Sequence, residues 1–356
     1  MTDISKPLSL AGIHPFGSPD LQQFEKWVTR FLTREYQRLI ASPVTLDACG
    51  MRTDEGEMWE QTDELMEGHY DEPLKFFETF LDRKYLAYTM AYYGETPEEI
   101  AEQNYTLEQA QAAKFRLACE RTGLQGNEKI FSIGAGFGGF ETYLAEHYPD
   151  IEVACITPSR VQTNYIRDKM ADKGHPLSRL NLRLIEDDFG TLPITAEEAG
   201  SYDMVFSVGA FEHVRNWQAA FSKIAGMLKP GGKHFQHLIA SKIVIPQFLD
   251  ARETLIGKYY PGGRIWPFDV IAAQNSHLEL EQSWFMNGLN YVRTLDEWHR
   301  NLWEGMNELY PDVLSEKSVK HWSEYFSLCK ACFAPLDGEV FGVGHFVFRK
   351  RRTCNQ

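Results

Sequence analysis

Several features that would assign this sequence to a membrane or to nucleic acid are missing from it. No apolar run approaches the roughly 18 residues that a membrane-spanning helix needs, and the first residues lack the basic segment followed by an apolar one that marks a secretory signal. A basic surplus is missing too, because the formal net charge is -14, which disfavours nucleic acid and anionic lipid surfaces as partners. We therefore expect a cytoplasmic protein with no stable membrane insertion and no nucleic acid partner.

The cysteines are few and lack the paired spacing of a disulfide framework. Six are scattered along the chain, so we expect reduced thiols. Cys329 and Cys332 form a single CxxC with no second pair and no nearby histidine, whereas a structural zinc site needs a full set of such ligands. The sequence therefore predicts no metal site.

What is present is an ordinary globular composition, in a chain long enough for one large domain with insertions or for two domains. Of the 356 residues, 43% are hydrophobic and 24% are charged. Apolar residues recur at helical spacing over 18–39, which predicts an amphipathic helix that packs as a cover. Thr106 and Gln109 have the spacing of a capping box and Gly123 follows as a C-terminal cap, which predicts a second helix.

From residue 128 short β-rich runs alternate with amphipathic stretches, which predicts an α/β fold with a Rossmann-like, doubly wound and mostly parallel sheet. Five runs lie between 129 and 240, a sixth covers 278–286, two helices follow at 293–309 and 316–333, and a last strand closes the chain. We divide the chain into an N-terminal helical cover with the segment that leads to the cofactor (1–127), the Rossmann-like core (128–240), a helical acceptor-binding lid with one core strand (241–335) and the closing strand (336–356).

The first of these strands ends in a glycine-rich turn that opens a helix. Gly134, Gly136 and Gly138 would let the backbone approach a ligand closely at a helix N-terminus. A dinucleotide-binding unit usually adds an acid at the tip of the second strand. Here that tip carries Thr157, with Gln162 beyond it and no acid, which argues against a nicotinamide cofactor.

The ends of the third and fourth predicted strands also carry polar residues, and open α/β sheets bind ligands at these carboxyl ends. The third strand ends in Asp187, Asp188 and Phe189, an acid that can accept from an adenine amino group beside a ring that can cover it. The fourth ends before Glu212 and His213. A solvated helix start is the alternative interpretation of that last pair.

Six ordered segments resemble one known family, the group of cyclopropane fatty acid synthases, mycolic acid methyltransferases and coclaurine N-methyltransferases. The stretch HYDEPLKFFETFLDRKYLAYTMAYY (69–93) resembles the family's HYD...FF...L....YSCAYF segment, FSIGAGFGG its LDIGCGWGG, and CITPSRVQ its VTLSxxQ. SVGAFEHV is similar to SVGMFEHV, YYPGGRIWP to FPGGxxPS, and WFMNGLNYVRTLDEWHRNL to W...G.NY..TL..W. The resemblance implies a class I methyltransferase that uses S-adenosyl-L-methionine and releases S-adenosyl-L-homocysteine.

The resemblance also implies which residues do what. The cofactor-binding set would be Tyr88, Thr89, Gly134, Gly136, Gly138, Thr157, Gln162, Asp187, Asp188 and Phe189. Glu212 would act as the base or as the carboxylate that stabilises a cationic acceptor, with His213 or Tyr325 assisting. The cyclopropane synthases hold a bicarbonate with a Glu, a His and a Tyr; Glu212 and Tyr325 match that set in register, and His277 matches only with a gap.

Other positions depart from the family pattern. Its cysteine in the YSCAY segment is Met90 here, and the aspartate of its glycine motif is Ser132. The alkaloid N-methyltransferases carry an additional glutamate three residues before their FEH, where this chain has Gly209.

These observations favour methyl transfer to a small or lipid-like hydrophobic acceptor by in-line displacement. The first choice is C-methylation of an alkene of isoprenoid or acyl type, because Gly209 and Tyr325 follow the cyclopropane synthase side. N-methylation of a hydrophobic, alkaloid-like amine is the alternative, and a non-catalytic protein that binds the cofactor is a remote one. A homodimer is left open.

Overall fold

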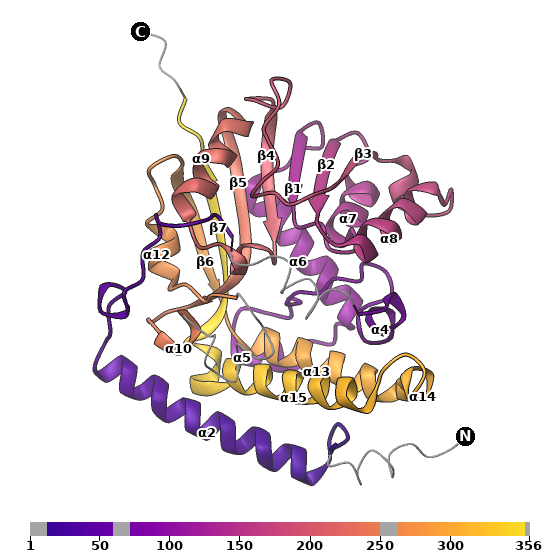
Figure 1. The fold of residues 1–356 in the computed structure, drawn as a ribbon, viewed down its shortest axis with the longest axis vertical. Helices are drawn as coiled ribbons and strands as arrows, with labels where there is room; N and C mark the ends of the chain where they lie inside the picture. Colours follow the sequence, from indigo (N-terminus) through magenta and orange to yellow (C-terminus); the bar gives the residue numbers. More distant parts are fainter. Residues whose placement is uncertain (1–12, 60–71, 250–262, 353–356) are drawn as a thin grey trace.

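The computed structural model describes residues 13–59, 72–249 and 263–352, and in them a seven-stranded sheet forms the centre (Figure 1). The strand order is β3-β2-β1-β4-β5-β7-β6. In this sheet only β7 runs antiparallel to its two neighbours, which is the arrangement of class I methyltransferases and confirms the predicted fold class. The strands are β1 (Lys129–Ile133), β2 (Glu152–Thr157), β3 (Asn181–Glu186), β4 (Tyr202–Val208), β5 (Leu228–Ser241), β6 (Glu279–Met286) and β7 (Phe341–Arg349).

Helices cover both faces of this sheet and the carboxyl ends of its parallel strands (Figure 1). The long helices are α2 (Pro19–Ala41), α6 (Leu107–Thr122), α7 (Gly139–His147), α8 (Arg160–Ala171), α9 (Trp217–Met227), α13 (Leu289–Glu304) and α15 (Glu316–Phe333). Shorter helical pieces are η1 (Asp47–Cys49), α4 (Leu74–Phe80), α5 (Pro97–Glu102), η3 (Pro176–Arg179), η4 (Phe211–His213), α10 (Pro246–Leu249), α12 (Phe268–Ala272), α14 (Met306–Leu309) and η5 (Pro335–Gly338). None of the helices in the described ranges is long and apolar enough to cross a bilayer.

The buried side chains form two main clusters, one on each face of the sheet. Residues of α6, α7 and α8 join the larger cluster, which continues into α13 and α15. Residues of α9 and α12 pack on the opposite face. Because β1 lies in the middle of the sheet, its last four residues are all buried, as expected for a parallel strand covered on both faces.

The helix predicted at 106–122 begins and ends as its sequence indicates. The Thr106 side chain accepts from the Gln109 backbone while the Gln109 side chain accepts from the Thr106 backbone, so the capping box is confirmed. Gly123 caps the C-terminus at φ +70°, in the left-handed region that suits glycine.

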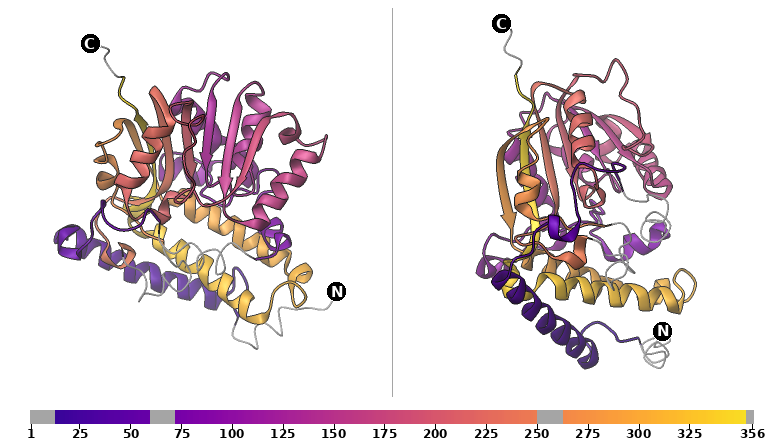
Figure 2. Two further views of the ribbon diagram at one scale, coloured as in Figure 1. Left: turned by 45° about the horizontal axis from the view of Figure 1, so that its top comes forward. Right: turned by 60° about the vertical axis from the view of Figure 1, so that its left-hand side comes forward.

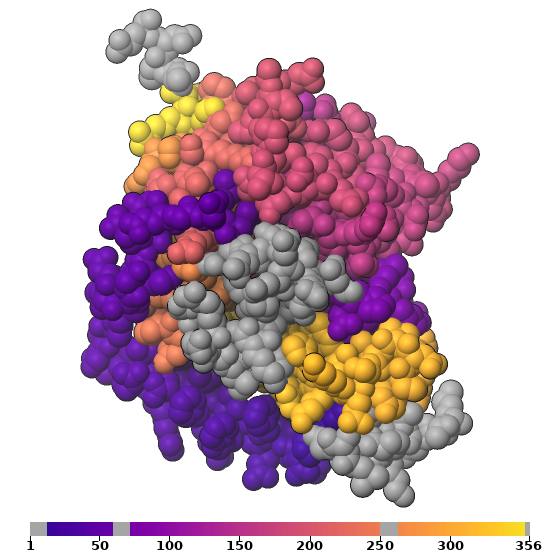
Figure 3. Space-filling view, viewed as in Figure 1, coloured from indigo at the N-terminus to yellow at the C-terminus, as the bar shows by residue number. Residues whose placement is uncertain are grey.

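Helices α13 and α15 lie across the carboxyl ends of the parallel strands, and α2 packs on the outer side of α15 (Figures 1 and 2). Val28 of α2 packs against Leu328 and Ala331 of α15. The Tyr36 hydroxyl donates to the Cys332 carbonyl over 3.2 Å. The prediction of a covering helix over 18–39 is therefore confirmed, and in the space-filling view the N-terminal part forms the lower left flank of the molecule (Figure 3).

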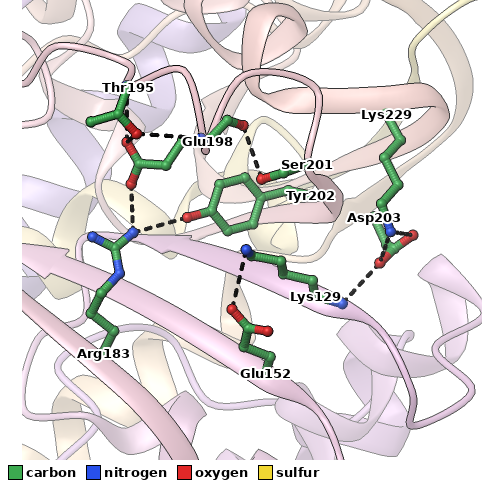
Figure 4. Close-up of polar contacts among 9 residues, drawn as sticks. All are labelled: Lys129, Glu152, Arg183, Thr195, Glu198, Ser201, Tyr202, Asp203 and Lys229. Atoms are coloured by element: carbon green, nitrogen blue, oxygen red, sulfur yellow. Dashed lines mark hydrogen bonds and ion pairs between the residues drawn. The ribbon is translucent and has the colours of Figure 1, made fainter.

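The amino ends of the strands, on the side of the sheet away from α13 and α15, carry a network of exposed charges (Figure 4). Lys129 pairs with Glu152 over 3.2 Å and Lys229 pairs with Asp203 over 2.7 Å. Ion pairs of this exposure contribute up to about 1 kcal/mol each. Because the glycine turn lies at the carboxyl ends of the strands, this network belongs to the surface and not to the ligand site.

Candidate active site

The glycine-rich turn between β1 and α7 opens onto a cavity at the carboxyl ends of the strands, here called the first cavity. The Gly134 and Ala135 backbone N–H groups both donate to the Ile156 carbonyl over 3.0 Å, which fixes the turn against β2. Gly136 has φ +57°, and a Cβ placed on it would meet no atom within 4 Å. The turn therefore presents bare backbone to open space, which is what close approach of a ligand requires.

The tips of β2 and β3 form the next wall of the first cavity. The Thr157 hydroxyl donates to the Gln162 side chain over 2.6 Å, so both side chains have defined positions. The Trp59 ring meets the Phe189 ring edge-on at 6.2 Å. The first cavity is lined by Trp59, Tyr88, Thr89, Ser132, Gly134, Gly136, Glu141, Thr157, Gln162, Asp187, Asp188, Phe189, Gly209 and His213, among others.

All residues of the predicted cofactor set line this cavity except Gly138. A Cβ at Gly138 would come within 3.2 Å of the Ile166 side chain, and its φ is +75°. Gly138 is the N-cap of α7, so the structure gives it a packing and turn role in place of a ligand contact.

Residues 86–89, just before Met90, line the first cavity and are held in place by hydrogen bonds. The Asp82 carboxylate accepts from the Tyr85 N–H over 2.7 Å and from the Ala87 N–H over 3.0 Å. The buried Gln111 amide donates to the Ala87 and Thr89 carbonyls over 3.2 and 2.9 Å. These bonds fix the position of Thr89, which lines the first cavity.

A second cavity continues from the first toward α13 and α15. Tyr88, Thr89 and Gly209 line both, so these three residues form the boundary between the cavities. A Cβ at Gly209 would lie 3.3 Å from the Thr89 side chain, at φ +76°, so a larger residue would narrow the passage. The remaining lining of the second cavity is Glu212, Ile239, Phe248, Ile265, Tyr291, Tyr325, Cys329, Cys332, Phe333 and Phe341.

Glu212 is the only acidic side chain that the described residues contribute to the lining of this second cavity. One of its carboxylate oxygens accepts from the Ile239 N–H over 2.9 Å, and the other has no hydrogen-bond partner among the described residues. Burial raises the pKa of Glu212 to about 7, while the Ile239 bond opposes the rise. A carboxyl group with that pKa exchanges protons readily at neutral pH.

His213 and Tyr325, the other predicted participants, lie on different sides of the boundary. Tyr325 lines the second cavity with Glu212, whereas His213 lines the first. The interpretation of Glu212 and His213 as a solvated helix start is wrong, because η4 is buried and their side chains are 4% and 8% exposed.

A chain of buried side chains leads from Thr89 into the sheet. Thr89 Oγ1 lies 2.8 Å from His237 Nε2, and His237 Nδ1 lies 2.7 Å from His345 Nε2. His345 Nδ1 is hydrogen-bonded by Arg121. Since a guanidinium only donates, each ring in turn must donate onward, and Thr89 must accept from His237. The Thr89 hydroxyl proton is then free to donate at the boundary of the two cavities.

Burial lowers the pKa of both rings well below the usual histidine value, and the charge of Arg121 adds to the effect. His237 and His345 are therefore neutral at physiological pH, which is the state that the donor chain requires.

The predicted bicarbonate set does not come together. His277 is exposed and lines neither cavity, so the described structure does not bring it to Glu212 and Tyr325. His237, which does reach the boundary, has both ring nitrogens in hydrogen bonds. The side chains present do not fit the proposed anion, and no step is derived through it.

Sequence reasoning missed Trp59, Glu141, His237, His345 and Arg121. The two histidines stand on strands distant in the sequence, and only the pairing of His237 with His345 across β5 and β7 brings them together. Residues 60–71 and 250–262, which include parts of the quoted HYD and PGG segments, lie outside the described residues. Among the described residues no cluster of His, Cys, Asp and Glu side chains is arranged to hold a metal.

Comparison with known proteins gives the family. The model of the mycolic acid cyclopropane synthetase family matches residues 59–342. The chain belongs to this family. That match spans the glycine turn, Glu212 and Tyr325, so it covers both cavities.

Similar proteins within the family differ in what their names say they act on. The chain is 30% identical to a probable fatty acid methyltransferase of Pseudomonas putida, over 76% of this chain and 66% of that one. It is 27% identical to the cyclopropane-fatty-acyl-phospholipid synthase of Escherichia coli (strain K12), over 77% and 65%. The chain thus spans just under two thirds of the length of these relatives.

A solved structure shows the same fold over nearly the whole chain. Coclaurine N-methyltransferase bound to N-methylheliamine and SAH superposes with a TM-score of 0.80, covering 98% of this chain and 99% of that one, at 20% identity. That likeness establishes the fold, including the helical layer over the strand ends.

Proposed function

We propose that this protein is an S-adenosyl-L-methionine-dependent methyltransferase that binds its cofactor in the first cavity and a hydrophobic acceptor in the second. The observation that carries the proposal is the boundary formed by Tyr88, Thr89 and Gly209, which both cavities share. A methyl group held at that boundary would face the acceptor directly, and Glu212 would lie on the acceptor side.

The residues of the first cavity suit the cofactor part by part. Gly136 offers backbone at the N-terminal end of α7, Phe189 and Trp59 offer rings, and Asp188 offers a carboxylate to an adenine amino group. When bound, the cofactor supplies an activated methyl group and a good leaving group. The chain then has to supply position, dryness and charge.

We place the methylated atom on carbon, in an alkene of isoprenoid or acyl type. The bound cofactor would supply the methyl group and keep the electron pair of the broken methyl–sulfur bond, the acceptor double bond would form the new carbon–carbon bond, and the ionised Glu212 would take the proton that the acceptor cation then loses. Tyr291 and Tyr325 face the same cavity, and each ring stabilises a nearby cation by about 0.5 to 2 kcal/mol. The apolar side chains of the lining, with Gly209 in place of a second glutamate, favour an uncharged acceptor.

A second candidate is N-methylation of a hydrophobic amine. The Glu212 oxygen that has no partner among the described residues supports it, because that oxygen suits an ammonium as well as a carbocation. A non-catalytic role loses its main support, since it requires Glu212 to point away from the cavity that it lines.

The test combines labelled cofactor with one variant. Incubation with methyl-deuterated S-adenosyl-L-methionine and a panel of prenyl, fatty acyl and amine acceptors, read by mass spectrometry, should show one labelled methyl on an alkene carbon. For a carbon acceptor, Glu212→Gln should reduce turnover by about 100-fold at every pH at which the wild-type carboxylate is ionised, because the acceptor cation then has no base. For an amine, raising the pH should restore much of the rate.

The matched control is Glu152→Gln, an exposed carboxylate at the opposite edge of the sheet. It should leave turnover unchanged. Unlabelled products with every acceptor class would refute methyl transfer, and wild-type turnover of Glu212→Gln throughout the pH range would remove Glu212 from the chemistry.

A further inference from the structure

Glu141 is a second buried carboxylate, on the wall of the first cavity, that the proposed chemistry does not use. It stands in the first turn of α7, its side chain has no exposed area, and it lines the cavity beside Ser132. Neither of its oxygens makes a hydrogen bond of ordinary geometry among the described residues, and the Ser132 hydroxyl is the one side chain near enough to favour its charged form. A carboxylate buried in this way is costly unless a partner reaches it.

The surroundings of Glu141 point to a cationic partner that comes from outside the chain. Burial raises the pKa of Glu141 to about 7, the nearby Ser132 hydroxyl opposes the rise, and no cation of the described residues is among the causes of the shift. The positive end of the α7 dipole lies at its first turn, which favours the ionised form. A positively charged hydrogen-bond donor for Glu141 would therefore have to come from a ligand bound in the first cavity.

The sequence explains why the carboxylate stands on this helix. Ser132 is the next-to-last residue of β1, at the position where the motif that FSIGAGFGG resembles has an aspartate. Ser132 and Glu141 both line the first cavity. The acid that is absent from the strand is thus replaced by one from α7 that faces the same space.

We propose that Glu141 binds the α-ammonium group of the methionine portion of the cofactor. The proposal rests on the cofactor assignment made above. The ammonium is a localised N–H donor that a carboxylate can bind directly, and Glu141 is the buried acid beside the glycine turn. Glu141 is accordingly a binding residue and takes no part in proton transfer to or from the acceptor.

Calorimetric binding to the purified full chain tests this directly. Glu141→Gln should weaken binding of both S-adenosyl-L-methionine and S-adenosyl-L-homocysteine by about 10-fold or more, since a charge-assisted bond is lost. It should leave binding of 5′-methylthioadenosine, which lacks the amino acid portion, unchanged. The control Glu146→Gln lies on the same helix, pairs with Lys84 over 3.0 Å and does not line the cavity; it should bind all three compounds as the wild type does.

Rescue distinguishes a binding role from a structural one. Adding Ser132→Asp to Glu141→Gln returns an acid to the wall and should restore at least part of the lost affinity. Proton release gives an independent readout: at about pH 7, binding should release more protons from the wild type than from Glu141→Gln, because the ammonium stabilises the ionised Glu141.

The outcomes separate this proposal from the function on which it rests. A wild type that binds neither S-adenosyl-L-methionine nor its product would overturn both. A wild type that binds them, beside a folded Glu141→Gln variant of equal affinity, would overturn only the role of Glu141. Equal loss of methylthioadenosine binding would also overturn it, because the contact would then not be with the amino acid portion.

Discussion

In the absence of cofactor, we expect the unfolding free energy of Glu212→Gln to increase relative to that of the wild type as the pH rises. In the folded state burial raises the pKa of this carboxyl group to about 7, whereas in the unfolded chain it returns to about 4.3. Between those values the folded state binds more protons than the unfolded state does. Wild-type stability therefore falls as the pH rises through this window, and the penalty is complete above the folded pKa.

The magnitude follows from the difference between the two pKa values. A pKa difference of 1 corresponds to about 1.36 kcal/mol, so the difference of roughly 2.7 between the folded and unfolded states amounts to about 3.7 kcal/mol, of which about 2 to 3 kcal/mol develops between about pH 5 and about pH 8. The amide that Glu212→Gln introduces keeps the acceptor for the Ile239 N–H and does not titrate in this range. The second buried carboxylate, Glu141, is present in both proteins and cancels in the comparison.

The assay is urea unfolding of the cofactor-free wild type and Glu212→Gln at both pH values. The difference in unfolding free energy between the two proteins should shift toward the variant by about 2 to 3 kcal/mol on going from the lower to the higher pH. A difference that stays constant with pH would refute the reasoning, since it would show that Glu212 titrates alike in the folded and unfolded chains.

Three further predictions concern the cofactor turn, the donor chain and the surface. Gly136→Val should abolish S-adenosyl-L-methionine binding in calorimetry. The control is Gly50→Val: Gly50 lies outside the site, with a similar φ of +64° and equally open space around it, so this variant should carry the same backbone strain and bind the cofactor normally. Near-normal affinity of a folded Gly136→Val would rule out the turn as the contact. Thr89→Val should lower kcat/KM by about 10-fold, because the donor at the cavity boundary is lost, and should lower the free energy of unfolding by about 1 to 3 kcal/mol, because the buried His237 N–H loses its acceptor; unchanged kinetics would show that this hydroxyl does not act there. With a net charge of -14, the purified protein should neither shift nucleic acid in a gel nor sediment with anionic vesicles at physiological salt, and tight binding to vesicles would move the acceptor toward membrane lipid.

Much of the fold was predictable because its strands are short apolar runs bounded by turns. Each of the seven predicted strands is present, and the cap at Gly123 is in place. The predicted helix over 293–309 was wrong in its bounds, since α13 begins at Leu289 and ends before Gly305, with α14 beyond it. A Cβ at Gly305 would lie 2.3 Å from the Thr79 side chain, and such a contact between distant segments leaves no local pattern.

The site was predictable where a strand end carries it and not where tertiary packing creates it. Thr157 ends β2 and Asp188 lies two residues after the end of β3, so their position at the ligand-binding ends of the strands follows from the topology. Glu141 looks like one of many helical glutamates, and only the packing of α7 on the sheet turns it toward the cavity. His277 was proposed by matching a spacing to the family, whereas the histidine that reaches Thr89 is His237, on β5.

The central claim is that a methyl group passes across the boundary of Tyr88, Thr89 and Gly209 from the first cavity to the second. A crystal structure of the protein with S-adenosyl-L-homocysteine and an unreactive alkene analogue tests it most directly, through the position of the sulfur atom. We predict that the sulfur lies at this boundary and faces the second cavity, with the analogue between it and Glu212. A sulfur atom directed away from the second cavity, or an analogue bound outside that cavity and out of reach of Glu212, would contradict the account.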